Sequence, residues 1–196
     1  MKKTIAALLV LASSFTFSSG GSLTESETWP QWRGLTRDGV AQGPDWPASL
    51  GENRLKQSWR RELSPGYSSP VVTVDRVFTV ETKDRKHEIV RALDRATGRQ
   101  IWETQWEGAM KVPFFANANG SWVRCTPAYD AGRLYVGGMR DVLVCLDAKT
   151  GETLWSVDFV KREKSRLPSF GFVSSPLVHG DSVYVQAGGA FVRLDK

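Results

Sequence analysis

The stretch Ala92-Leu93-Asp94-Arg95-Ala96-Thr97-Gly98-Arg99-Gln100-Ile101-Trp102 has a second copy, Cys145-Leu146-Asp147-Ala148-Lys149-Thr150-Gly151-Glu152-Thr153-Leu154-Trp155. In both copies a Gly stands four positions after the Asp, and a Trp stands four positions after the Gly. An Asp side chain can accept hydrogen bonds from the backbone N–H groups that follow it, and Gly adopts positive φ without strain. Each copy therefore predicts a tight turn that leads into a strand carrying the Trp.

The residues before each turn repeat as well. Three small-small-Pro elements occur, Ser68-Ser69-Pro70, Cys125-Thr126-Pro127 and Ser174-Ser175-Pro176, and an apolar-aromatic pair begins seven residues after each Pro. Short β-branched and aromatic runs separated by turn residues indicate four strands in each unit of about 50 residues, which is typical of a propeller blade. The sequence thus predicts an all-β fold, a β-propeller of four-stranded antiparallel blades at 64–107, 121–158 and 172–196, the last of them incomplete.

The first copy resembles in full the Ala-x-Asp-x-x-x-Gly-x-x-x-Trp docking motif of pyrroloquinoline-quinone (PQQ) type β-propeller repeats, and the second departs from it only at Cys145. The segment from Trp29 to Gly39 resembles the start of secreted bacterial PQQ-like propeller proteins. This family contains quinoprotein dehydrogenases and cofactor-free relatives of the outer-membrane assembly factor type, BamB. The resemblance implies that each Trp docks its blade onto the next one. The implied docking residues are Ala92, Asp94, Thr97, Gly98, Trp102, Cys145, Asp147, Thr150, Gly151 and Trp155.

The N-terminal residues have the parts of a secretory signal peptide, which we place at 1–20. A basic start at Lys2 and Lys3 precedes an apolar run at 5–12, and small residues follow at 18–21. The apolar run is far shorter than the roughly 20 residues that cross a bilayer. We therefore expect an exported protein, periplasmic or extracellular, with no transmembrane anchor after cleavage.

Residues 21–63 are interpreted as a lead-in and a closing outer strand. The run Leu55–Trp59 resembles an isolated outer strand, and in this family such a strand completes the last blade of the ring. About three blades are present, and the sequence ends where a third Thr-Gly-x-x-x-Trp should follow. These features predict the N-terminal portion of an eight-bladed ring that is monomeric at full length. A self-contained four-bladed ring is the alternative.

Composition excludes several classes of protein. The net charge of +5 is small and interspersed, so no nucleic-acid partner is predicted. Two Cys and two His exclude a disulfide framework and a multi-His metal centre. Cys125 and Cys145 are expected on the first and third strands of one blade as buried free thiols. Glu81 and Asp84 are expected in a solvated, charge-mixed loop.

A catalytic set is not recognisable in the sequence. The resemblance implies that a quinoprotein dehydrogenase carries a vicinal Cys-Cys pair, Ca²⁺-binding carboxylates with an Asn, and an Asp base, and none of these is found here. No catalytic, cofactor-binding or metal-ligating residue is predicted, which favours a protein-interaction or scaffold module of the cell envelope, BamB-like in class. The alternative is the N-terminal part of a PQQ-dependent dehydrogenase that binds PQQ and Ca²⁺ through residues elsewhere.

Two of the connections between blades carry insertions, and these should emerge on the same face as the loops between second and third strands. Loops on a rigid scaffold are where function concentrates. Cations beside apolar rings suit an acidic protein segment, an extended peptide or an anionic polymer; solvated charge with loop-packing aromatics is the alternative. The predicted interaction residues are Lys111, Phe114, Phe115, Arg162, Lys164, Arg166 and Phe170.

Overall fold

The structure is a computed structural model that describes residues 28–41, 49, 51 and 56–196. The signal peptide predicted at 1–20 lies outside the described residues, as does Leu55. Within the described part, no helix is long and apolar enough to cross a membrane.

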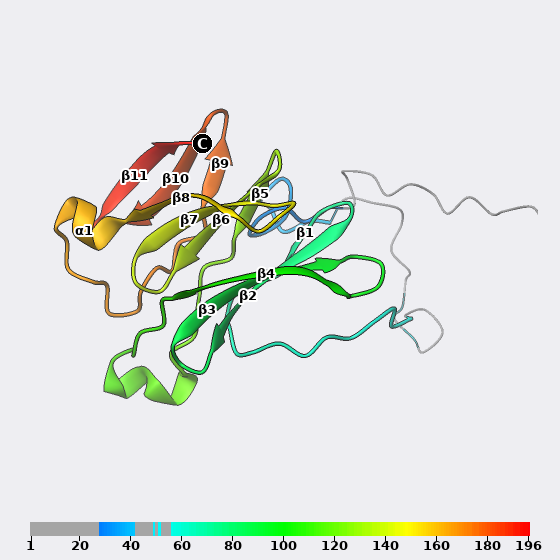
Figure 1. The fold of residues 1–196 in the computed structure, drawn as a ribbon, viewed down its shortest axis with the longest axis horizontal. Helices are drawn as coiled ribbons and strands as arrows, with labels where there is room; N and C mark the ends of the chain where they lie inside the picture. Colours follow the sequence, from blue (N-terminus) through cyan, green and yellow to red (C-terminus); the bar gives the residue numbers. More distant parts are fainter. Residues whose placement is uncertain (1–27, 42–48, 50, 52–55) are drawn as a thin grey trace, which may run out of the picture.

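In the described residues, eleven strands form three antiparallel sheets in chain order (Figure 1). The first sheet contains β1 (Val71–Val72), β2 (Arg76–Lys83), β3 (His87–Asp94) and β4 (Gln100–Glu107). The second contains β5 (Ala128–Asp130), β6 (Arg133–Gly138), β7 (Val142–Asp147) and β8 (Thr153–Asp158). The third contains β9 (Leu177–His179), β10 (Ser182–Ala187) and β11 (Ala190–Asp195). Each sheet is a meander of neighbouring strands, which confirms the prediction of four-stranded antiparallel propeller blades, with three strands in the last one.

The core lies between the sheets. Buried residues of β6 and β7 alternate along each strand, so that Leu134 and Val136 contact the first sheet while Tyr135 contacts the third. This alternation follows from the two-residue period of a strand. A blade in the middle of a row is therefore buried on both faces, which is why β6 and β7 are almost continuously apolar.

Both long connections contain a short helix that the sequence analysis did not predict. The 3-10 helix η2 (Phe114–Asn119) lies between β4 and β5, and α1 (Phe159–Glu163) lies between β8 and β9. The side chain of Asp158 caps α1 by accepting a hydrogen bond from the backbone N–H of Lys161 at 3.0 Å.

The lead-in at 28–41 runs along the inner strands of all three sheets. Trp29 forms a bridge with Val72 through both backbone hydrogen bonds, and the next carbonyl accepts from Tyr129 N at 2.7 Å. The Arg37 guanidinium donates to the carbonyl of Pro176 at 2.6 Å, just before β9. In Figure 1 this blue segment lies beside β1 and β5. The lead-in thus ties the three blades together.

The outer strand expected at Leu55–Trp59 stays a prediction, because the blade that it would complete is not among the described residues. Residues 56–60 form no strand. A strand is defined by hydrogen bonds to a partner strand, and no partner strand pairs with this segment in the described chain. Trp59 is nevertheless held against the first blade, because its Nε1 donates to the carbonyl of Arg95 at 2.8 Å.

Candidate interaction face and interblade contacts

The two repeated turns are built by their own side chains. Asp94 Oδ1 accepts from Thr97 N at 2.8 Å and from Thr97 Oγ1 at 2.7 Å. Asp147 Oδ1 likewise accepts from Thr150 N at 2.8 Å and from Lys149 N at 2.8 Å. These hydrogen bonds lower the pKa of both aspartates below the ordinary value. Each turn then closes through a Gly at positive φ, +69° at Gly98 and +80° at Gly151.

Each of these glycines accommodates an indole from the preceding segment. A Cβ on Gly151 would lie 2.7 Å from the Trp102 ring, and a Cβ on Gly98 would lie 2.6 Å from the Trp59 ring. Only a residue without a side chain lets the rings approach this closely. Trp102 is 9% exposed, and its Nε1 donates to the carbonyl of Ala148 at 3.1 Å. In the described repeats, each blade turn with a Thr-Gly pair is thus packed against one Trp.

Two of the predicted docking residues, Ala92 and Cys145, lie next to the indole rings on the neighbouring strand. Ala92 is directly opposite Trp102 on the neighbouring strand, and Cys145 is opposite Trp155. Trp155 is half-buried and lies against Tyr135, with ring centroids 5.9 Å apart. Both small residues are fully buried, so a larger side chain at either position would displace the ring that covers it.

A second set of interblade contacts occurs at the opposite ends of the strands. Glu88 Oε1 accepts from Met139 N of the second blade at 2.6 Å, and Glu88 Oε2 accepts from Trp106 Nε1 at 2.6 Å. Asp141 Oδ2 accepts from Gly188 N of the third blade at 2.7 Å. Both carboxylates stand six positions before the turn aspartate of their copy. The repeat therefore links blades through an acid at one end and a Trp at the other.

Both acids are buried, Glu88 at 0% and Asp141 at 1% exposure. Burial raises the pKa of Glu88, while its two hydrogen bonds and the charge of Arg140 oppose the rise. Burial also raises the pKa of Asp141, with a further contribution from the charge of Asp158. Sequence analysis missed both acids, although their equal position in the two copies was a signal that could have found them.

The expectation that Glu81 is solvated is wrong. Because β2 continues to Lys83, the Glu81 side chain points into the fold and is 1% exposed. It accepts from Ser64 N at 2.7 Å and forms an ion pair with Arg91. Asp84 does lie in an exposed turn. Glu81 therefore fastens the segment before β1 to the first sheet.

Cys125 and Cys145 are free and buried, as the sequence predicts. Cys125 precedes β5 rather than lying within it. Burial raises the pKa of the Cys125 thiol to about 12 and that of Cys145 to about 11. Both thiols are therefore protonated at neutral pH and act as small apolar groups.

The inserted connections carry an exposed aromatic cluster, Phe114, Phe115 and Phe170. Phe114 is 87% exposed and Phe115 71%, and their rings meet edge to face at 5.8 Å. Phe170, from the connection after α1, lies 6.3 Å from Phe115. The Arg124 guanidinium lies over the rings of Phe170 and Tyr67, at 5.7 Å and 5.0 Å. Three rings from two connections thus form one apolar surface in contact with solvent.

The cations predicted at 161–166 are partly neutralised by their own segment. Arg162 Nε lies 3.1 Å from Glu163 Oε1, and Lys161 Nζ lies 3.1 Å from Asp158 Oδ2. Lys164 ends α1 in the left-handed conformation, at φ 48°. Lys164 and Arg166 are both exposed.

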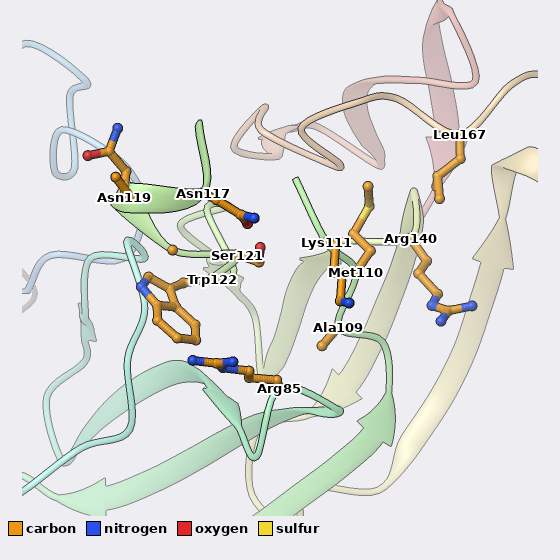
Figure 2. A pocket seen from close by; sticks show the side chains of 12 residues that line it. Arg85, Ala109, Met110, Lys111, Asn117, Asn119, Ser121, Trp122, Arg140 and Leu167 are labelled. Atoms are coloured by element: carbon orange, nitrogen blue, oxygen red, sulfur yellow. The ribbon is translucent and has the colours of Figure 1, made fainter. Parts of the chain in front are cut away.

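Lys111 belongs to a different group of cations. A cavity of about 1020 Å³ opens on the same face, with Arg85, Lys111 and Arg140 among its lining residues (Figure 2). Its other walls include Met110, Asn117, Ser121, Trp122 and Leu167. No three His, Cys, Asp or Glu side chains among the described residues come together so as to hold a metal ion.

Sheets stacked face to face, with a Trp of one seated on the turn of the next, define a run of β-propeller blades. Comparison with known families gives the particular class. The family model described as "Outer membrane protein assembly factor BamB", a PQQ-like repeat model, matches residues 86–196, which is more than half of the chain. The chain belongs to this family.

Among curated proteins, the chain is similar to quinone-dependent alcohol dehydrogenases. It is 30% identical to the dehydrogenase subunit of Gluconobacter oxydans (strain 621H) over 70% of this chain and 18% of that protein. It is 29% identical to quinohemoprotein alcohol dehydrogenase ADH-IIG of Pseudomonas putida over 72% of this chain and 19% of that protein. The chain thus spans about a fifth of the length of these relatives.

The solved structures that resemble part of the chain include a BamB and a quinohemoprotein alcohol dehydrogenase. BamB from Moraxella catarrhalis gives a TM-score of 0.49 at 21% identity, over 70% of this chain and 36% of that one. The quinohemoprotein alcohol dehydrogenase ADHIIG from Pseudomonas putida HK5 gives 0.48 at 26% identity, over 70% of this chain and 20% of that one.

Proposed function

We propose that this chain is part of an exported, non-catalytic β-propeller that serves as a protein-binding module of the cell envelope. The observation that carries the proposal is the exposed aromatic cluster of Phe114, Phe115 and Phe170 on the inserted connections. Contiguous exposed apolar surface marks interaction sites on soluble folds. Membership in the family of outer-membrane assembly factors supports an envelope location.

The scaffold suits such a role because the blades that carry the inserted connections are fixed to one another. The blades are fixed to one another by the Trp contacts and by the buried acids Glu88 and Asp141. Aromatic anchors presented by a rigid fold bind with little loss of conformational entropy. Burying one Phe side chain against a partner is worth about 1.5–3 kcal/mol.

The experiment is capture of partners from an envelope extract by the full-length protein, followed by identification of what is bound. The test variant is Phe114→Ser with Phe115→Ser. Phe191→Ser is the matched control, because Phe191 is 74% exposed but lies on β11, outside the cluster of Phe114, Phe115 and Phe170. We expect the double variant to lose the captured partner and the control to keep it. Equal capture by all three proteins would overturn the proposal.

The second candidate is the N-terminal part of a quinoprotein dehydrogenase, which the curated relatives favour. The described residues do not fit its cofactor: Cys125 and Cys145 are separate free thiols, and no acidic cluster is arranged to hold Ca²⁺. This function would therefore need residues other than those described. Dye-linked alcohol oxidation by full-length protein supplied with PQQ and Ca²⁺ would establish it, and lack of oxidation would remove it.

A further inference from the structure

Three cations from three separate loops line the cavity on the inserted face. Arg85 lies in the turn between β2 and β3, Lys111 in the connection after β4, and Arg140 in the turn between β6 and β7. Within the described part of the chain, none of the three forms a hydrogen bond or an ion pair through its side chain. No Asp or Glu is among the lining residues. Arg140 also acts electrostatically on the buried Glu88. The cavity walls themselves therefore carry three positive charges and no acidic side chain.

The backbone of Arg85 shows that its placement is costly. Asp84 and Arg85 both have φ of 53°, in a turn closed by the Lys86 N–H donating to the Lys83 carbonyl at 3.0 Å. The second central residue of such a hairpin turn is ordinarily Gly. An Arg at this position bears left-handed strain while it places a guanidinium at the cavity. Strain of this kind concentrates at functional sites.

The remaining walls give the cavity a flat apolar side and polar groups. Trp122 and Arg85 line one side, and Arg140 and Leu167 line the other (Figure 2). Asn117 and Ser121 add an amide and a hydroxyl. Carboxylates beside apolar groups would find suitable contacts on every wall.

The cavity is continuous with the aromatic cluster through two shared segments. The helix η2 carries Phe114 and Phe115 and also lines the cavity with Asn117. The connection after α1 lines the cavity with Leu167 and supplies Phe170 three residues later. An occupant that fills the cavity and also covers the rings must extend beyond a small anion.

We infer that the cavity receives the carboxylate side chains of an acidic segment of the protein partner, whose neighbouring apolar side chains cover Phe114, Phe115 and Phe170. The inference rests on the proposed function and names the chemistry of the partner. It places recognition of acid at Arg85, Lys111 and Arg140. Arg162, Lys164 and Arg166 then contribute only to long-range attraction.

Fluorescence anisotropy tests the inference with a labelled peptide that contains two Glu flanked by two Phe, and with the same peptide carrying Gln for Glu. The full-length protein is compared with the cavity variant Arg85→Gln, Lys111→Gln, Arg140→Gln. The matched control is Arg162→Gln, Lys164→Gln, Arg166→Gln, which removes the same charge from the same face. We expect the cavity variant to bind the Glu peptide about tenfold or more weakly, and the control to change affinity by no more than about twofold. Circular dichroism and the urea midpoint establish that each variant is folded.

Three results would overturn the inference. The unaltered protein could bind the Glu and Gln peptides with equal affinity, or the two triple variants could lose equal affinity for the Glu peptide. The third is that citrate competes with the Glu peptide and binds the protein with the same affinity as the peptide. The last result would assign the cavity to free small anions. Failure here is distinguishable from failure of the proposed function. If the cavity variant still captures the envelope partner while Phe114→Ser with Phe115→Ser does not, the aromatic cluster binds and the cavity does not recognise acid.

Discussion

The indole N–H of Trp102 donates a hydrogen bond to the carbonyl of Ala148, 3.1 Å away and one residue after the aspartate of the next blade's turn. Trp59 repeats the relationship with the carbonyl of Arg95 at 2.8 Å. In both cases the ring lies over the Gly that closes the turn. The repeated turn and the Trp of the preceding segment therefore form one packing contact, which we call the joint.

Replacing Trp102 should loosen this joint. Trp102→Ala is expected to lower the free energy of unfolding by roughly 3–5 kcal/mol, as other buried aromatic truncations do. Trp102→Phe should cost less, because most of the buried ring area is kept while the hydrogen bond to Ala148 is lost. Urea denaturation of the full-length protein measures both. An unchanged midpoint for Trp102→Ala would show that the ring does not hold the blades together.

Gly151 and Gly132 are a matched pair for testing whether the close approach of the Trp102 ring requires a residue without a side chain. Both have positive φ, +80° and +83°, so Ala at either position bears about 1–2 kcal/mol of backbone strain. A Cβ at Gly132 meets nothing within 4 Å, whereas one at Gly151 meets the Trp102 ring at 2.7 Å. Gly151→Ala should therefore lower the melting temperature distinctly more than Gly132→Ala. Equal shifts would leave backbone strain as the whole effect and remove the steric argument.

Glu88 should make stability depend on pH. Its pKa is raised in the folded protein, so folding favours the protonated acid. The stability of the protein relative to Glu88→Gln should be greatest below about pH 4.5, the ordinary Glu value, and should fall as pH rises through the folded pKa. The lowered pKa values of Asp94 and Asp147 act in the opposite direction, but they cancel in this difference.

The measurement is the urea midpoint of both proteins between about pH 4 and pH 8. Glu152→Gln, which removes an exposed carboxylate from a blade turn, serves as the control. A difference between the protein and Glu88→Gln that stays constant with pH would contradict the assignment of Glu88 as a buried titrating group.

Arg85→Gly should stabilise the fold and weaken the site together. Gly relieves the left-handed strain at φ 53°, which should raise the free energy of unfolding by about 1 kcal/mol. The same change removes one of the three cavity cations. Thermal denaturation and binding of the Glu peptide should therefore move in opposite directions. A variant that is less stable than the parent would show that the arginine supports the turn.

Sequence reasoning found the parts of the fold that are encoded locally. The turn at Asp94–Gly98 is specified by its own side chains, so it could be read from a single segment. The repeat spacing could have marked Glu88 as a candidate, but its hydrogen-bond partner could not be read from its own segment, because Met139 N belongs to another blade. The strand expected at Leu55–Trp59 stays a prediction for a related reason, since a strand is defined by hydrogen bonds to a neighbouring strand and none pairs with this segment in the described chain.

The candidate face was predicted more completely in its rings than in its charges. Phe114, Phe115 and Phe170 do meet, because their insertions emerge side by side. The density of cations at 161–166 led the sequence to predict that segment as the charged part of the face. Ion pairs with Asp158 and Glu163 reduce the charge of the segment. Arg85 lies in a charge-mixed turn between Asp84 and Lys86, and the sequence places it on the same face as Arg140, but only the structure shows that the two line one cavity with Lys111.

Site-specific photocrosslinking in living cells gives the most direct measurement of the interaction face. A photoreactive phenylalanine analogue is placed at Phe115 and, in a separate protein, at Ala131, an exposed residue in the β5–β6 turn at the other end of the blade. We expect a discrete crosslinked protein from position 115, absent from position 131 and lost when Arg85, Lys111 and Arg140 are changed to Gln. A crosslink from position 131 with none from position 115 would contradict the assignment of the inserted connections as the binding surface.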